Sequence, residues 1–427
     1  MRQTRPACAK AVGREAGRKA RTRGESISWI GNNSYRTLII DQAGAKPSGE
    51  EVMTTSYERS TLNSIGGGLL VEHQRLATSG ARAVLAFTAG AELRLAVPQL
   101  AVDLPDAPAR MNGGNSDVDM LLYRWVAGRF VGDTGLRVPG GEDAAFFRIG
   151  GAEFLATASV RTGAGPYDLN TASVVYRRAA DTWESFQSFP TFAAKQWHFF
   201  SFDGRYFLAL AQGVVMEGVE ARNPRRSCLF EWDGTQFAEF QTLDGQWGYN
   251  WDFFEVDGRR LLAYADHVRP SKLLIWNGAS FSPFQEFSPT GGRAFHFFRA
   301  DGQGWLAFAN LTGESLLYRW SGDRFEPHQS LGGPGTREFA LTRTERGLYL
   351  VQINFIEGTQ AAPKTDLTSR IYRWQDGRLT VVEEFPTSGG TDAAVFTADG
   401  RSYLAVANSL SRDIRFREDT VIYRFDG

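Results

Sequence analysis

Three aromatic residues in the middle of the sequence are each followed directly by a side chain that could bind or react: Trp197-His198, Trp251-Asp252 and Phe295-His296. Each pair opens a similar apolar run, so a repeating fold would bring the pairs side by side. Aromatic faces beside a few polar groups suit the recognition of a sugar or a peptide. The predicted ligand-binding set also includes the polar residues at the ends of the following runs: Asp266, His267 and Asn310.

The same polar side chains have other possible uses. His198, Asp252, His296 and Asp266 are ligand types for a transition metal, and Asp143, Asp252, Glu338 and Asp392 could hold Ca²⁺ in a channel. The sequence has no closely spaced pair of histidines. The expectation is therefore no cofactor and no metal, with a channel Ca²⁺ as the alternative. In a third interpretation, the aromatic residues are core and the polar groups line a wet channel.

Catalytic motifs are missing from the sequence. It has no G-x-S-x-G nucleophile motif, and the glycine run at Ile65–Gly68 lacks the Lys-Ser/Thr of a phosphate-binding loop. No catalytic residue is predicted, and a binding module is favoured over an enzyme. The alternative is a propeller hydrolase, lyase or lactonase that uses His198, Asp252 and His296 around a cation at the channel mouth.

The elements that must position these residues recur along the chain. The stretch LLYRWSGDRFE at Leu316–Glu326 recurs six more times along the chain. The positions equivalent to its Trp320 are 125, 178, 232, 276, 374 and 425, so seven copies span 125 to 425 with a mean spacing of 50 residues. A fixed period of this length indicates a repeat array or a propeller.

A second motif lies between the copies, as in FFSFDGRYFLALAQ at Phe199–Gln212, FFEVDGRRLLAYAD at Phe253–Asp266 and FFRADGQGWLAFAN at Phe297–Asn310. Asp-Gly supplies the positive φ angles of a two-residue hairpin turn. Each repeat therefore predicts four short antiparallel strands, called A to D from the FF run onward, which is the size of one propeller blade.

The two ends of the repeat region complement each other. Leu69–Leu76 resembles a strand D with no A, B or C before it, whereas the chain stops at Gly427 just after a strand C. We predict an all-β, seven-bladed propeller of four-stranded antiparallel blades over residues 67–427, with the N-terminal strand completing the last blade. Such closure leaves no open sheet edge between the ends.

In order along one repeat, the combined pattern reads Y-R-W-x-G-x-F, then Q, then T-G-G, then F-F-x-x-D-G-x-x-Y-L-A-V-A-N. It resembles the epitempin-associated repeat, called EAR or EPTP. This repeat is found in the leucine-rich glioma-inactivated proteins and in microbial relatives. The resemblance implies a seven-bladed propeller that binds a protein or a carbohydrate, and it does not imply an enzyme. Two positions depart from the pattern: Thr88–Ala91 replaces the Asp-Gly turn of blade one, and Arg178 replaces the tryptophan of blade two.

The function is expected on one rim of the propeller. In an A-B-C-D blade the B-to-C and D-to-A connections share a rim, and the former vary in length here, from Pro98–Asp119 to Leu311–Glu314. Variable loops on a rigid scaffold commonly carry function. The starts of strands A meet at the same rim. There the alignment puts Trp197, Trp251 and Glu338 in one layer, and His198, Asp252 and Phe339 in the next.

Residues 1–66 lie outside the repeat and begin with a basic run, which predicts a disordered basic tail. The chain has 47 Lys and Arg against 48 Asp and Glu, so its net charge of −1 disfavours nucleic acid as a partner. The basic run is not followed by the apolar segment of a secretory signal, and no apolar run is long enough for membrane insertion. A soluble protein is expected, and its compartment and oligomeric state stay open.

Overall fold

The computed structural model describes residues 68–427 except 218, 219 and 225, so the tail expected at residues 1–66 lies outside the described residues. The described part of the chain contains strands and turns but no α-helix. It accordingly has no helix that could cross a membrane. The all-β expectation is confirmed.

The first three blades lie in chain order and are antiparallel throughout. Blade one consists of β2 (Leu85–Ala89), β3 (Glu92–Val97), β4 (Asp119–Val126), β5 (Arg129–Gly132) and the short β6 (Leu136–Arg137). Blade two consists of β7 (Gly141–Ile149), β8 (Ala152–Ser159), β9 (Asn170–Ala179) and β10 (Thr182–Phe192). Blade three consists of β11 (Ala194–Phe202), β12 (Arg205–Gln212), β15 (Arg226–Trp232) and β16 (Phe237–Asp244). The loop of blade three carries the small hairpin of β13 (Val215–Glu217) and β14 (Glu220–Arg222).

The next three blades repeat this order. Blade four consists of β17 (Gly248–Val256), β18 (Arg259–Asp266), β19 (Ser271–Trp276) and β20 (Phe281–Phe287). Blade five consists of β21 (Gly292–Ala300), β22 (Gln303–Asn310), β23 (Leu316–Trp320) and β24 (Phe325–Ser330). Blade six consists of β25 (Thr336–Thr344), β26 (Gly347–Asn354), β29 (Asp366–Gln375) and β30 (Arg378–Ser388). Its loop carries the hairpin of β27 (Glu357–Thr359) and β28 (Ala362–Lys364).

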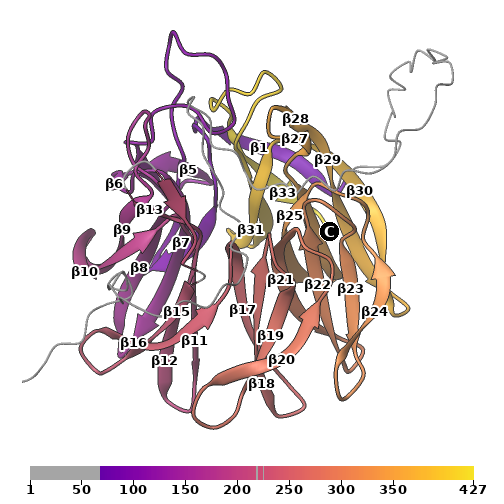
Figure 1. The fold of residues 1–427 in the computed structure, drawn as a ribbon. Helices are drawn as coiled ribbons and strands as arrows, with labels where there is room; N and C mark the ends of the chain where they lie inside the picture. The colour runs from indigo at the N-terminus through magenta and orange to yellow at the C-terminus, as the bar shows by residue number, and fades with distance from the viewer. Residues whose placement is uncertain (1–67, 218–219, 225) are drawn as a thin grey trace, which may run out of the picture.

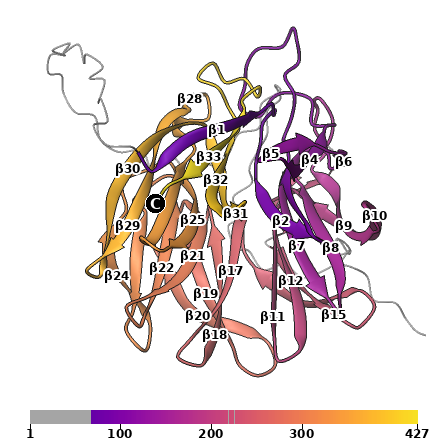
Figure 2. The same ribbon diagram turned by 180° about the vertical axis from the view of Figure 1, so that it is seen from behind.

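Blade seven joins the two ends of the described chain. Its strands are β31 (Gly390–Ala398), β32 (Arg401–Asn408), β33 (Thr420–Phe425) and β1 (Leu70–Leu76). β1 pairs antiparallel with β33 from Leu70 opposite Phe425 to Leu76 opposite Thr420, and Figure 2 shows the indigo β1 beside the yellow β33. The seven four-stranded blades and the predicted closure by the N-terminal strand are therefore confirmed.

The Asp-Gly turns explain the uniform hairpins between the first and second strands of the blades. Asp257 has φ of 47° and Gly258 has φ of 72°, and the turns at Asp203, Asp301 and Asp399 have the same signs. Positive φ at both central residues gives the turn whose twist matches the flanking strands. Aspartate tolerates this conformation better than most residues, and glycine adopts it freely.

The FF motif packs neighbouring blades together. Its second phenylalanine stacks on the first phenylalanine of the next blade: Phe147 lies 4.3 Å from Phe199, Phe200 lies 4.5 Å from Phe253, and Phe254 lies 4.2 Å from Phe297, measured between ring centroids. Both faces of a blade therefore bury apolar side chains, which is why these strands read as continuous apolar runs.

A glutamine in the outermost strand links most pairs of adjacent blades. Its side-chain amide donates to a backbone carbonyl of the next outermost strand and accepts from the N–H of the same residue, as Gln285 does with Phe325 at 2.7 and 2.9 Å. We call these contacts the glutamine staples. The five staples are Gln74–Phe130, Gln187–Phe237, Gln241–Phe281, Gln285–Phe325 and Gln329–Leu379.

Glu383 occupies the staple position of blade six, opposite β1. Its carboxylate accepts hydrogen bonds from the backbone N–H groups of Leu69 and Leu70. The strand that closes the ring is thus bound to blade six by a charged relative of the staple. Burial raises the pKa of Glu383, although these amide hydrogen bonds oppose the shift.

The two rims of the propeller differ. Figure 1 shows the loops that join β3 to β4 and β32 to β33 projecting at the top of the view, while short hairpins such as β17–β18 lie at the bottom. We call these ends the loop rim and the hairpin rim. Side chains from several loops share one buried cluster, which includes Leu100, Leu311, Phe355, Leu410 and Phe416.

Candidate functional site

The innermost strands of the blades surround an axial cavity of about 280 Å³ that lies toward the loop rim. Six of these strands begin with a bulge; in β21, for example, the pairing with β22 shifts between Gly292 and Ala294. Because the bulge breaks the alternation of side chains, Arg293 lines the cavity, while Ala294 after it packs in the core between blades five and six. A small residue is needed at Gly292, since an added Cβ would lie 2.2 Å from Ser271 Oγ.

Four cations line the cavity: three directly follow the small residue that opens a bulge, and Arg82 directly follows Ala81 ahead of β2. They come from blades one, three, five and six, and we call them the channel-mouth cations: Arg82, Lys195, Arg293 and Arg337. Tyr249 holds the same place in blade four, and its ring centroid lies 3.8 Å from the Arg293 guanidinium carbon. The alignment of the sequence considered only the two positions further along each strand, so this layer was missed. The signal available was a small residue followed by Arg or Lys at four strand starts.

Glu142 is the carboxylate of this layer. Its Oε1 lies 3.0 Å from Arg82 Nη2, 3.1 Å from Arg337 Nη2 and 3.5 Å from Lys195 Nζ. Burial raises the pKa of Glu142, but the three cations outweigh burial and hold its pKa below the ordinary value. Burial and the neighbouring Arg82 lower the pKa of Arg337 to about 10, and burial lowers the pKa of Lys195.

The next layer bonds adjacent blades. Asp143 accepts from Trp197 N–H at 2.9 Å, Asn250 from Phe295 N–H at 2.9 Å, and Asp392 from Val84 N–H at 2.8 Å. Burial and the charge of Asp392 raise the pKa of Glu338, and burial raises the pKa of Asp392 to about 6. The alignment was wrong in blade six. Thr336 begins its bulge, so Glu338 belongs with Asp143 and Asp392, and Phe339 belongs with Trp197.

The three predicted aromatic platforms lie in the core between blades. Trp197, Trp251 and Phe295 have exposed fractions of 2, 1 and 1 %, and each belongs to a cluster of side chains from two adjacent blades. Trp251 and Phe295 border the cavity, but their rings pack against Tyr264 and Phe308 at 4.3 and 4.8 Å. Their faces are therefore occupied by the protein itself.

The predicted polar partners of these aromatics do line the cavity, one layer deeper. His198 Nε2 accepts from Phe253 N–H at 3.1 Å, and Asp252 Oδ2 accepts from Phe297 N–H at 2.8 Å. Burial lowers the pKa values of His198 and His296 to about 4 and raises that of Asp252 to about 7. Burial thus favours the neutral forms of all three.

Asp266 and Asn310 form turns below the loop rim. Both are fully buried. Asp266 accepts from the N–H groups of Gln246, Val268 and Arg269, and Asn310 Oδ1 accepts from those of Thr312 and Gly313. These hydrogen bonds explain why the two loops that follow are short.

His267 is half-buried beside Tyr249, with ring centroids 6.0 Å apart. Burial and the charge of Arg293 lower its pKa to about 3. It is not among the residues that line the cavity, and the structure brings it together with Tyr249 rather than with His198 or His296.

The metal alternatives receive no geometric support. Within residues 68–427, apart from the three masked positions, no group of three or more His, Cys, Asp or Glu is arranged to hold a metal ion. Asp143 and Asp392 each use a carboxylate oxygen on a backbone amide of the next blade. The channel Ca²⁺ stays a prediction.

Comparisons with known proteins agree with the repeat. A family model described as the EPTP domain matches residues 236–277, 280–321 and 378–426. The resemblance to the EAR/EPTP repeat is therefore confirmed over these three segments. Each matched EPTP segment starts in the outermost strand of one blade and ends after the third strand of the next, as in β16 to β19. One EPTP repeat therefore spans a blade boundary, which suits a motif whose residues join neighbouring blades.

Similar proteins carry the repeat in a longer chain. The human thrombospondin-type laminin G domain and EAR repeat-containing protein is 30 % identical over 22 % of this chain and 14 % of its own length. The mouse protein of the same name is 27 % identical over 36 % of this chain and 22 % of its own length. The alignments thus cover less than a quarter of each relative.

The EPTP tryptophan and the Asp-Gly aspartate contact each other across blades on the hairpin rim. The indole N–H donates to the turn carboxylate in three pairs: Trp125–Asp399 at 2.8 Å, Trp320–Asp257 at 2.6 Å and Trp374–Asp301 at 2.7 Å. These motif residues therefore bind neighbouring blades to each other.

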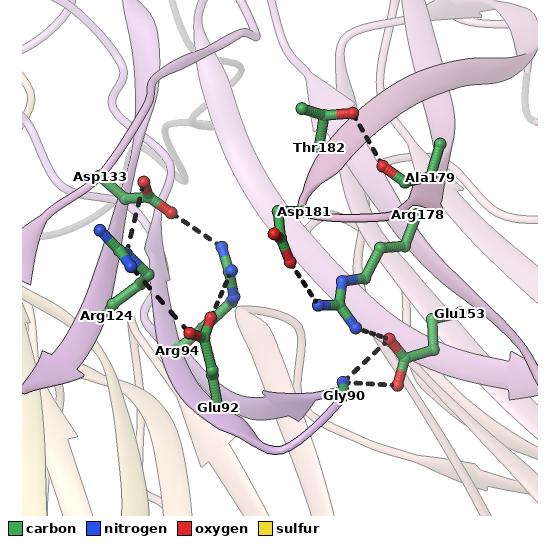
Figure 3. A network of polar contacts seen from close by, with 10 residues as sticks. All are labelled: Gly90, Glu92, Arg94, Arg124, Asp133, Glu153, Arg178, Ala179, Asp181 and Thr182. Carbon is green, nitrogen blue, oxygen red and sulfur yellow. Dashed lines mark hydrogen bonds and ion pairs between the residues drawn. The ribbon is translucent and has the colours of Figure 1, made fainter.

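Blades one and two lack both EPTP motif residues at their shared boundary, and Figure 3 shows what replaces them. Arg178, in place of the tryptophan, donates to Glu153 at 3.0 Å, and Glu153 accepts from the N–H of Gly90 in the turn of blade one at 3.0 and 3.1 Å. Asp181 also lies 3.3 Å from Arg178. The two departures from the repeat pattern thus compensate each other.

Proposed function

We propose that this EPTP propeller is a non-catalytic module that binds a partner protein on its loop rim. The observation that carries the proposal is the shared apolar cluster beneath the loops. Leu100, Leu311, Phe355 and Phe416 come from loops of four different blades and are buried together. Loops held against one another form a single preorganised surface, which lowers the entropy lost on binding.

The hairpin rim is less suited to recognition. Its turns are short and similar, and the tryptophan and aspartate side chains of the EPTP motif bond to one another there. The loops of the opposite rim differ in length and sequence from blade to blade, from Pro98–Asp119 to Leu311–Glu314. Differences between otherwise equivalent blades are what a selective surface requires.

A protein ligand is favoured over a glycan by the burial of the predicted platforms. Sugar recognition of the kind expected from Trp197, Trp251 and Phe295 needs an open ring face, and these side chains are at most 2 % exposed. Protein recognition needs no such plane, because a few anchor side chains within a wide interface supply most of the binding energy. A glycan ligand is the other outcome that the experiment must be able to detect.

Site-specific photocrosslinking tests the choice of rim. A photoreactive amino acid replaces Val102 or Arg412, both exposed on the loop rim, and the matched control replaces the exposed Glu345 in a hairpin turn. Both loop-rim positions should crosslink to the same protein, excess unlabelled propeller should compete, and the control should not crosslink to it. Equal crosslinking from both rims, or binding only in a glycan array, would contradict the proposal.

A further inference from the structure

The axial cavity has a chemical character that protein recognition by the loops does not explain. Four cations from four separate blades, Arg82, Lys195, Arg293 and Arg337, line its mouth. Three of them are buried, with exposed fractions of 7, 7 and 8 % for Lys195, Arg293 and Arg337. Buried cations are costly unless they are paired, so the partners of these side chains decide what the cavity can hold.

The protein supplies too little negative charge for this layer. Glu142 pairs with Arg82, Lys195 and Arg337, so a single carboxylate forms ion pairs with three of the four cations. In the described part of the chain no carboxylate forms an ion pair with Arg293, whose guanidinium instead stacks on Tyr249. The raised pKa values of Asp143 and Glu338 favour their neutral forms. Asp392 also lines the cavity, and with a pKa of about 6 it is largely charged at pH 7, so it adds one negative charge and the cations stay in excess.

Two of the cations also have donors without acceptors. Arg293 Nε and Arg337 Nη1 are buried and have no hydrogen-bond partner, although both side chains line the cavity. The other nitrogens of Arg337 are used, with Nε on the Thr391 carbonyl at 3.1 Å and Nη2 on Glu142. A buried donor without a hydrogen-bond partner costs more free energy on a charged group than on a neutral one. A negatively charged acceptor would satisfy these donors and also offset the excess positive charge.

We propose that the cavity binds a small oxyanion, such as phosphate, sulfate or a small carboxylic acid, between Arg293 and Arg337. Guanidinium groups favour such ligands because their N–H donors match the spacing of carboxylate and phosphate oxygens. The cavity volume of about 280 Å³ exceeds that of several waters at roughly 30 Å³ each. Aromatic rings support the cations, since Phe355 lies 5.5 Å from Arg82 and 5.1 Å from Arg337.

Calorimetric titration of the full-length chain with inorganic phosphate, and separately with sulfate, acetate and citrate, tests the site at constant ionic strength. Binding of at least one oxyanion is expected, and Arg293→Gln and Arg337→Gln should each weaken it at least about tenfold. Arg293→Gln is the cleaner change because it breaks no ion pair. The matched control is Arg319→Gln, since Arg319 lines a different cavity, on the hairpin rim, and this variant should bind as the wild type does.

Crystals grown with selenate provide a second measurement that does not depend on the folding of a variant. The anomalous selenium peak should lie within hydrogen-bonding reach of Arg293 Nε and Arg337 Nη1. Failure of all four anions to bind at millimolar concentration, equal weakening in Arg319→Gln, or a selenium peak only outside the cavity would overturn the proposal. Failure of the loop-rim crosslinks would leave it standing, because the oxyanion site rests on the channel-mouth cations and not on the exposed loops.

Discussion

Replacing the staple glutamine Gln285 by alanine should destabilise the propeller measurably. The change removes the hydrogen bonds from Nε2 to the Phe325 carbonyl at 2.7 Å and from Phe325 N–H to Oε1 at 2.9 Å. A hydrogen bond contributes about 1 kcal/mol net, and a donor or acceptor left unmet in a buried place costs more. Because both staple bonds are only partly buried, water can replace some of what is lost. We expect the free energy of unfolding to fall by about 2 kcal/mol.

Urea unfolding followed by tryptophan fluorescence measures this loss as a shift of the midpoint at unchanged slope. Gln74→Ala should lose a similar amount, since Gln74 forms the same two bonds with Phe130 across the ring closure. The control is Gln375→Ala, the same chemical change at an exposed position at the end of β29. If Gln285→Ala and Gln375→Ala unfold within about 0.5 kcal/mol of each other, the staples do not join the blades energetically.

Three pH-dependent predictions follow from buried groups. Glu383 has a raised pKa in the folded state, so wild-type stability should fall as pH rises through that value. Glu383→Gln should avoid this loss and gain about 1 kcal/mol of stability at pH 8 from a restored staple. Lower stability of the variant at both pH 5 and pH 8 would contradict this prediction. Burial lowers the pKa of His198 to about 4. Acidification from about pH 6.5 to 4 should therefore reduce the free energy of unfolding of the wild type by up to about 3 kcal/mol more than that of His198→Gln, measured by thermal or urea unfolding. Equal acid sensitivity of the two proteins would refute this prediction. Burial raises the pKa of Tyr249, but the channel-mouth cations outweigh it and lower the pKa to about 8. Binding of sulfate, whose own charge is constant over this range, should therefore weaken between pH 7 and 9 as a phenolate forms beside the site. Over that range Glu142 stays charged and His267 stays neutral. Burial lowers the pKa of Lys195, so a Tyr249→Phe variant is needed to isolate the tyrosine, and its binding should depend less on pH than that of the wild type in the same titration.

The blade architecture could be predicted because its signals are local. An apolar run, a turn that requires positive φ and a second apolar run are each encoded by residues adjacent in sequence, and the structure places Asp257 and Gly258 at the φ values that such a turn needs. The number of repeats and the matching deficits at the two ends then left one way to close the ring, and β1 pairs with β33 accordingly.

The contacts between blades were harder to predict. The tryptophan and the Asp-Gly aspartate were both recognised as repeated residues, yet nothing in their spacing shows that Trp320 donates to Asp257, 63 residues earlier. The same applies to Arg178 and Glu153, whose ion pair replaces that contact at the boundary between blades one and two, where the sequence lacks both motif residues. Such pairs depend on how far one blade is rotated against the next.

The site was predicted only in part, because six of the seven inner strands begin with a bulge. If side chains alternated strictly along each inner strand, their sequence positions would show whether Trp197 and Trp251 face the channel or the core. The bulge inserts one extra residue and shifts this alternation. It puts the tryptophans between blades and turns Lys195 and Arg293 toward the axis. The sequence by itself determined the strands, the turns, the sevenfold repeat and the closure, because each follows from neighbouring residues. Only the tertiary structure decided which side chains meet at the axis, because the channel-mouth cations lie in four blades, at least 44 residues apart in the chain, and become neighbours when the ring closes.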